Sequence, residues 1–110
     1  MSRVTEAAIL KRLKASAKVR GLRVLRMSLR QGVEVGWPDT LILGPAADVL
    51  LPTLFIETKA PGKPLKPIQE ERRREIETRG GLYAKADSVE DVEDALETFA
   101  QFCKAIVEAK

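Results

Sequence analysis

The chain has 110 residues, of which 45% are hydrophobic and 32% charged, a balance typical of one folded domain and not of a disordered tail. One cysteine and no histidine exclude an internal disulfide, the usual zinc sites and every His-based catalytic triad, so any metal must be bound by oxygen. The net charge of +3 is unevenly distributed, because residues 1–30 carry nine Lys or Arg residues and one acid, whereas residues 87–110 carry seven acids and two lysines.

The basic N-terminal segment suits a polyanionic partner, for which nucleic acid is the first candidate. The alternative is that these charges lie on solvated faces of helices and strands. No segment approaches the roughly 18 consecutive apolar residues of a membrane span, and the N-terminus lacks the apolar region of a signal peptide. We therefore expect an intracellular protein without a membrane partner.

A helix and a strand are expected first. The helix is capped by Ser2, runs to about Lys18 and ends at Gly21, and the strand spans Leu22–Leu29. The apolar stripe of the helix consists of Ile9, Leu10, Leu13 and Ala17. Extending this stripe backwards at helical spacing places Glu6, the only acid of the segment, on the core-facing side, where its carboxylate needs a partner.

Two further strands, Trp37–Leu43 and Thr53–Lys59, follow a loop through Gly32 and Gly36. Side chains alternate in the second of these strands, so that one face carries Phe55, Glu57 and Lys59 and the other carries Leu54, Ile56 and Thr58. Apolar members on both faces predict a central strand that is covered on each side, with its charged end partly buried. An unpaired charge is costly there, and the alternative is an ordinary ion pair or a frayed strand end in water.

The rest of the chain is predicted to form a loop, two helices and a short strand. Residues 60–67 contain three prolines and form the loop, residues 67–79 form a helix, residues 82–86 form a strand, and Ser88 caps a final helix. The final helix has apolar positions that suit packing against the sheet or, alternatively, a dimer contact, namely Val89, Val92, Leu96, Phe99, Cys103 and Ile106. The whole order predicts a single compact α/β domain.

Three acids and a lysine form a candidate metal site. If the strands of Asp39 and Glu57 are neighbours, the two carboxylates converge, and two partly buried acids need a cation. Glu6 supplies a third oxygen donor, and an all-oxygen site suits Mg²⁺ or Mn²⁺. Lys59 then lies beside the metal, where it can orient or deprotonate a water molecule or stabilise the charge of the transition state. Gln69 is the remaining polar candidate, with a surface glutamine as the alternative.

Four features occur in a fixed order, namely Glu6, "GWPD" (36–39), "FIETK" (55–59) and "APGKPLKPIQ" (60–69). Together with the glycine-rich turn and short strand that follow, they resemble the VRR-NUC domain, a branch of the PD-(D/E)XK nuclease superfamily. The resemblance covers about residues 3–87 of a single domain that spans residues 1–110, and residues 88–110 add a C-terminal helix. The segment "LYAKADS" (82–88) departs from the family because it lacks the Val-Arg-Arg-like run that gives the family its name.

The resemblance implies a restriction-endonuclease-like αβββαβ core, in which helices flank a mixed central sheet. It implies that the metal is bound by Asp39, Glu57 and the backbone carbonyl of Thr58, with Lys59 at the attacking water. Glu6 would be a further metal or water ligand, and Gln69 would help to position the site. Stand-alone VRR-NUC domains of this length resemble phage or bacterial proteins that dimerise and resolve four-way DNA junctions, which implies the cytoplasm of a bacterium or of a phage-infected host cell.

These observations predict a Mg²⁺- or Mn²⁺-dependent, structure-selective DNA endonuclease of DNA repair or recombination, acting as a homodimeric Holliday junction resolvase. The candidate contacts to DNA phosphates, which position DNA without reading its sequence, are Lys11, Arg12, Lys14, Lys18, Arg20, Lys63 and Lys66. Two alternatives stay open. One is a flap, nick or general duplex nuclease that is directed by a partner, and the other is a DNA-binding module that keeps the fold without cutting.

Overall fold

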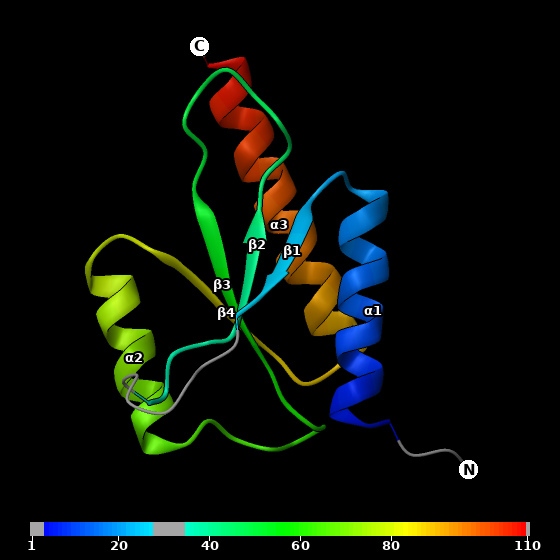
Figure 1. Cartoon of the computed structure of the whole chain (residues 1–110), viewed down its shortest axis with the longest axis vertical. Helices are drawn as coiled ribbons and strands as arrows, with labels where there is room; N and C mark the ends of the chain where they lie inside the picture. The colour runs from blue at the N-terminus through cyan, green and yellow to red at the C-terminus, as the bar shows by residue number, and fades with distance from the viewer. Residues whose placement is uncertain (1–3, 28–34, 110) are drawn as a thin grey trace.

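A four-stranded mixed sheet forms the centre of the computed structural model, which describes residues 4–27 and 35–109 (Figure 1). The elements follow in the order α1 (Glu6–Val19), β1 (Arg23–Arg26), β2 (Thr40–Leu43), β3 (Thr53–Thr58), α2 (Pro67–Thr78), β4 (Leu82–Ala86) and α3 (Val89–Glu108). The strands lie in the order β1-β2-β3-β4, with the first two pairs antiparallel and β3 parallel to β4. The predicted element order and α/β class are confirmed. None of the described helices is long and apolar enough to cross a membrane.

Helix α1 begins later than expected. Its cap is Thr5, whose hydroxyl oxygen accepts a hydrogen bond from the Ala8 N–H at 3.1 Å, and not the predicted Ser2, which lies outside the described residues. Its predicted end is confirmed, because Gly21 follows the helix with a φ of +71° and donates its N–H to the Lys18 carbonyl at 3.1 Å.

The first two strands are shorter than expected. Strand β2 begins at Thr40 and not at Trp37, because Pro38 has no backbone N–H to donate to the sheet. The predicted end of the first strand, residues 28–29, and Gly32 of the following loop lie outside the described residues. The two observed strands form four directly opposed residue pairs with each other.

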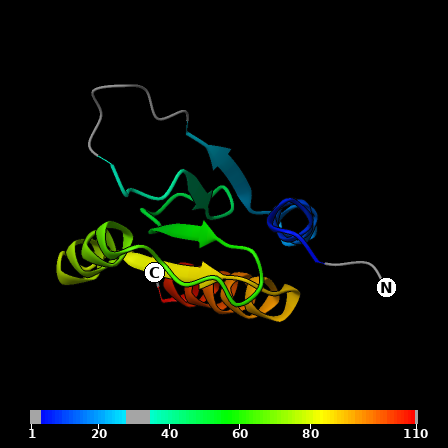
Figure 2. The same ribbon diagram turned by 90° about the horizontal axis from the view of Figure 1, so that it is seen from below.

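One face of the sheet packs against α1 and α3. The sheet contributes Ile42, Leu54, Ile56 and Ala86, and the helices contribute Ile9, Leu13, Ala17, Val92, Leu96, Phe99 and Cys103. The predicted stripe of α1 is therefore confirmed except for Leu10, which is only partly buried. Figure 2 shows α3 lying along one side of the sheet. The predicted packing of the final helix against the sheet is confirmed for four of its six apolar positions, but Val89 is exposed and Ile106 is only partly buried. The use of this helix as a dimer contact stays a prediction.

Helix α2 covers the other face. Phe55 of β3 lies opposite Tyr83 of β4 there, because directly paired residues share a face. Ile76 of α2 lines a small pocket together with Phe55 and Trp37, and the Arg72 guanidinium lies 4.8 Å from the centroid of the Trp37 ring. In Figure 1, α1 and α2 accordingly lie on opposite sides of the strands. The prediction that β3 is covered on both faces is confirmed.

Ion pairs join α1 to α3 at the surface. Arg20 contacts Glu93 at 2.9 Å and Glu97 at 3.1 Å, and Arg12 contacts Glu93 at 3.0 Å. Arg20 also donates a hydrogen bond to the Ser16 hydroxyl. The hydrogen bond from Arg12 makes the largest contribution to lowering the pKa of the Glu93 carboxyl. Two of the predicted phosphate contacts, Arg12 and Arg20, are thus already engaged by acids of the same chain.

Candidate functional site

Asp39 and Glu57 lie at the same end of two neighbouring strands. Strands β2 and β3 are antiparallel, and Thr40 lies opposite Ile56, with both side chains buried. Asp39 directly precedes Thr40 and Glu57 directly follows Ile56, so the two acids share the opposite face at adjacent positions. The two strands are neighbours, which was the condition for the carboxylates to converge.

The carboxyl group of Glu57 lies where a negative charge is unfavourable. Burial raises its pKa to about 7, and the negative charges of Asp39 and Glu6 add to the rise. The positive charges of Lys59 and Arg26 act in the opposite direction. Glu57 is therefore within electrostatic reach of all four groups, and a further cation would relieve the repulsion among the three acids.

Lys59 continues β3 by one residue and is only 6% exposed. Its backbone N–H donates to the Ala86 carbonyl at 2.9 Å, which extends the pairing of β3 with β4. An ammonium group so deeply placed needs compensating negative charge, and Glu57, two residues before it on the same face, supplies one. Thr58 between them is buried on the core face. The metal contact through its carbonyl stays a prediction.

Glu6 is exposed, so the prediction that it lies on the core-facing side of its helix is wrong. It is the first residue of α1, nearly a full turn before the first buried residue, Ile9, and the core does not extend that far. A carboxylate is nevertheless favourable at this position, because the N-terminal end of a helix carries partial positive charge. Its charge still acts on Glu57, so the N-terminus of α1 lies beside the candidate site.

The segment before Asp39 is fixed by a close contact with α2. Gly36 has a φ of +90°, and a Cβ at this position would lie 2.7 Å from Ile68 Cγ1 and 3.0 Å from the Ile68 carbonyl oxygen. Only glycine fits both the conformation and the space. The glycine of "GWPD" therefore lets the chain that carries Asp39 pass directly against the first turn of α2.

Gln69 caps α2 and shapes the loop before it. Its Oε1 accepts a hydrogen bond from the Lys66 N–H at 2.8 Å. The same loop is tied to the end of β4, because the Asp87 carboxylate accepts from the Gly62 N–H at 3.1 Å. Lys63 and Lys66 are exposed in this loop. Gln69 thus has a defined structural contact, and its role in the chemistry stays a prediction.

Arg26 is a site residue that the sequence analysis missed. Its guanidinium lies 3.1 Å from Asp39 Oδ2, while the Thr40 hydroxyl donates to Asp39 Oδ1 at 3.2 Å. The register places the Arg26 backbone opposite Thr40, one position from Asp39, and the long arginine side chain reaches diagonally to that carboxylate. Alternation along one strand does not reveal which residue faces which across the pair, so the sequence carried no signal for it.

Tyr83 was also missed. Its hydroxyl is buried and has no hydrogen-bond partner among the described residues. Burial raises the pKa of this hydroxyl, and the negative charge of Glu57 adds to the rise. The Arg73 guanidinium lies 5.6 Å from the centroid of the ring. A buried polar atom that finds no partner in the described part of the chain is the kind of group that a bound ligand can satisfy.

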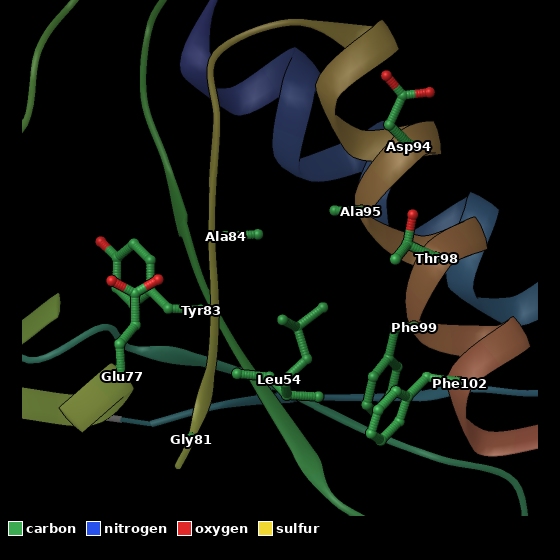
Figure 3. Close-up of a pocket in the computed structure, with 11 residues that line it drawn as sticks. Leu54, Glu77, Gly81, Tyr83, Ala84, Asp94, Ala95, Thr98, Phe99 and Phe102 are labelled. Carbon is green, nitrogen blue, oxygen red and sulfur yellow. The ribbon is translucent and has the colours of Figure 1, made fainter. Parts of the chain in front are cut away.

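A pocket of about 410 Å³ lies between α3 and the strands β3 and β4, and Glu77 of α2 also lines it. Figure 3 shows Leu54, Phe99 and Phe102 lining it, and the rest of its wall is mostly apolar. Its acids, Glu77 and Asp94, are not residues of the predicted site. Tyr83 lines the pocket as well, whereas Asp39, Glu57 and Lys59 do not, so the pocket and the candidate site share Tyr83 but not the charged residues at the end of β3.

The donor set fits a hard divalent cation. Within residues 4–27 and 35–109, no three Asp, Glu or Cys side chains are close enough together to hold a metal, so Glu6 does not complete a three-carboxylate site in this arrangement. Mg²⁺ is commonly bound through one or two carboxylates and keeps several water molecules. Two adjacent carboxylates, Asp39 and Glu57, with a main-chain carbonyl nearby, meet that requirement.

Two solved structures share the fold of this chain. One, described as "VRR_NUC domain", matches 87% of this chain and 99% of its own with a TM-score of 0.71 and 22% sequence identity. The chain has a VRR-NUC fold. A "VRR_NUC domain protein" matches 92% of both chains with a TM-score of 0.67 and 20% identity. The resemblance predicted from "GWPD" and "FIETK" is confirmed for the fold, whereas no protein-family model and no curated protein matches the sequence.

Replacing Glu57 by Gln should change how stability depends on pH. The pKa of Glu57 is 4.5 in the unfolded chain and about 7 in the folded protein. Ionisation of this carboxyl group therefore destabilises the fold progressively as pH rises from 4.5 to about 7. In EDTA at pH 8, Glu57→Gln should therefore be more stable than the parent by about 1–2 kcal/mol, a figure reduced because Glu57 is partly solvated.

Urea denaturation at pH 4 and pH 8 measures this difference, with Glu77→Gln on the exposed surface of α2 as the control. The stabilisation by Glu57→Gln should disappear at pH 4. A difference of the same size at both pH values would contradict the account.

Replacing Tyr83 by Phe should stabilise the protein by about 1 kcal/mol, because it removes a buried hydroxyl that has no partner among residues 4–27 and 35–109 and keeps the ring under Arg73. Tyr83→Leu, which also removes the ring, should be less stable than Tyr83→Phe. Chemical denaturation of the three proteins tests this expectation. A loss of stability in Tyr83→Phe would show that the hydroxyl contributes a hydrogen bond in the folded protein.

Proposed function

We propose that the chain is a divalent-metal-dependent DNA endonuclease that hydrolyses phosphodiester bonds. The observation that carries the proposal is the grouping of Asp39, Glu57 and the buried Lys59 at one end of neighbouring strands. The VRR-NUC fold supports it, since that resemblance implies this same set of residues as the nuclease site. An acid pair held together despite repulsion also indicates a site made for a cation.

Each residue of the site has a distinct role in the proposed reaction. Asp39 and Glu57 would hold Mg²⁺ or Mn²⁺, which when bound lowers the pKa of a coordinated water and polarises the scissile phosphate. The ammonium group of Lys59 is placed to stabilise the negative charge that develops on the phosphate. Its low exposure strengthens that interaction, because little water is present to screen the charge.

Exposed lysines provide the contacts to the DNA backbone. Residues 11, 14 and 18 are spaced so that their side chains lie on one face of α1, and all three are exposed. Lys63 and Lys66 add two exposed positive charges in the loop that follows β3. Since the chain has five aromatic residues in all, stacking of bases on an aromatic platform is a poor fit. Recognition by charge and shape suits a structure-selective enzyme.

A four-way junction is the proposed substrate, and a homodimer is the proposed assembly. One chain has one such site, whereas resolving a junction takes two symmetric cuts, which a two-fold dimer would supply. Full junction activity from a protein that light scattering shows to be monomeric would contradict the dimer. Cutting of flaps, nicks or plain duplexes would favour a nuclease directed by a partner, and binding without cutting would favour a non-catalytic module.

Metal-dependent cleavage tests the function itself. A labelled four-way junction, a flap and a linear duplex of matching sequence are incubated with the protein in Mg²⁺, Mn²⁺ or EDTA. We expect paired cuts in the junction that need the metal, and a loss of at least about 100-fold in Glu57→Gln and in Lys59→Met. Glu77→Gln should cut at the parent rate. Retention of the parent rate by either site variant would overturn the assignment.

Removing the three lysines of α1 tests the DNA contacts. The triple replacement of Lys11, Lys14 and Lys18 by Gln should weaken binding to the junction and reduce the slope of log affinity against log salt by about 2 to 3. Fluorescence anisotropy across a salt series in EDTA measures both quantities, with Lys104→Gln on α3 as the control. A slope that does not change would place the DNA on another surface.

A further inference from the structure

The pairing of β1 with β2 brings the backbones of Arg26 and Asp39 close together. Strand β1 pairs with β2 so that Arg26 faces Thr40, and the Met27 N–H donates to the Asp39 carbonyl at 2.7 Å, which extends the pairing to Asp39 itself. The side chains of Arg26 and Asp39 are 39% and 41% exposed. The pairing thus fixes the Arg26 backbone one position from that of Asp39, and the arginine side chain spans the remaining distance to the proposed metal ligand.

The two oxygens of Asp39 have different partners. Oδ1 accepts from the Thr40 hydroxyl, whereas Oδ2 lies 3.1 Å from the Arg26 guanidinium. Thr40 is fully buried, so its hydrogen bond fixes the orientation of the carboxylate from within the fold. A cation that binds this carboxylate must therefore compete with Arg26 for Oδ2. Arg26 also reduces the repulsion felt by Glu57, so its charge acts on both acids.

We propose that Arg26 is a positioning residue that takes the place of the metal in the metal-free protein and turns to a DNA phosphate once the metal binds Asp39. The inference rests on the proposed function, because it assumes the metal site at Asp39 and Glu57. The further step is that Arg26, which lies outside the nuclease motif, pairs with Asp39 in the metal-free protein and contacts DNA in the metal-bound protein.

The energetics of the pair suit such an exchange. An ion pair this exposed changes the equilibrium constant for pairing Arg26 with Asp39 by a factor of no more than about five. A divalent cation, with twice the charge, can therefore displace the guanidinium. The released guanidinium stays at the rim of the site, since its backbone is fixed by the β1–β2 pairing. A planar guanidinium can bind two phosphate oxygens at once, which makes a nearby DNA phosphate its natural next partner.

Calorimetric titration of Mn²⁺ into the DNA-free protein tests the first half of the proposal. Arg26→Gln should bind Mn²⁺ about three- to five-fold more tightly than the parent, because the competitor for Asp39 is gone. Arg23→Gln, which removes an exposed arginine from the other end of β1, should bind like the parent. Arg26→Lys keeps the charge and should give an affinity between those of the parent and Arg26→Gln, and it provides the comparison if the Gln variant does not fold.

Junction binding tests the second half. In a Lys59→Met background, which prevents cutting, Arg26→Gln should weaken junction binding in Mn²⁺ about three-fold or more and leave binding in EDTA nearly unchanged. Unchanged or weaker Mn²⁺ affinity in Arg26→Gln, or equal losses of DNA binding with and without Mn²⁺, would overturn the proposal. A parent protein that binds no Mn²⁺ would instead overturn the metal site of the proposed function, so the two failures are distinct.

Discussion

Repulsion between Asp39 and Glu57 is the constraint on which the rest of the site depends. The pairing of β2 with β3 brings both carboxylates to adjacent positions, and burial of Glu57 makes its negative charge costly. Lys59 and Arg26 lower the pKa of Glu57, but burial keeps it raised. A fold that keeps such a pair in place without fully neutralising it is typical of a binding or catalytic site.

Because side chains alternate along β3, one face of the strand packs in the core and the other carries the candidate site. One face of the strand contributes Leu54 and Ile56 to the core formed with α1 and α3. The other face carries Phe55 under α2 and then Glu57 at the open end. Because the apolar contacts on both faces hold the strand, the charged end can be placed precisely without contributing to stability itself. Gly36 and Gln69 complete the support, because Gly36 lets the segment before Asp39 pack against α2 and Gln69 fixes the loop that precedes α2.

The sequence predicted those features that depend on one element at a time. The alternation of "FIETK", the stripe of α1 and the loop with three prolines all follow from local periodicity and backbone restrictions, and the structure has them. Features that depend on how two elements meet were predicted only on a condition, as for Asp39 and Glu57, or not at all. The Arg26 to Asp39 contact needs the β1–β2 register, and the engagement of Arg20 needs the packing of α1 on α3. Extending the helical stripe to Glu6 failed because periodicity does not reveal where the core ends.

Locating a bound metal ion in a crystal is the decisive experiment for the shared site of Asp39 and Glu57. Crystals of the protein soaked in Mn²⁺ and measured at the manganese absorption edge would show the ion as an anomalous difference peak. The account predicts a peak about 2–2.5 Å from a carboxylate oxygen of both Asp39 and Glu57. A peak bound elsewhere, or bound to only one of the two acids, would contradict the shared metal site.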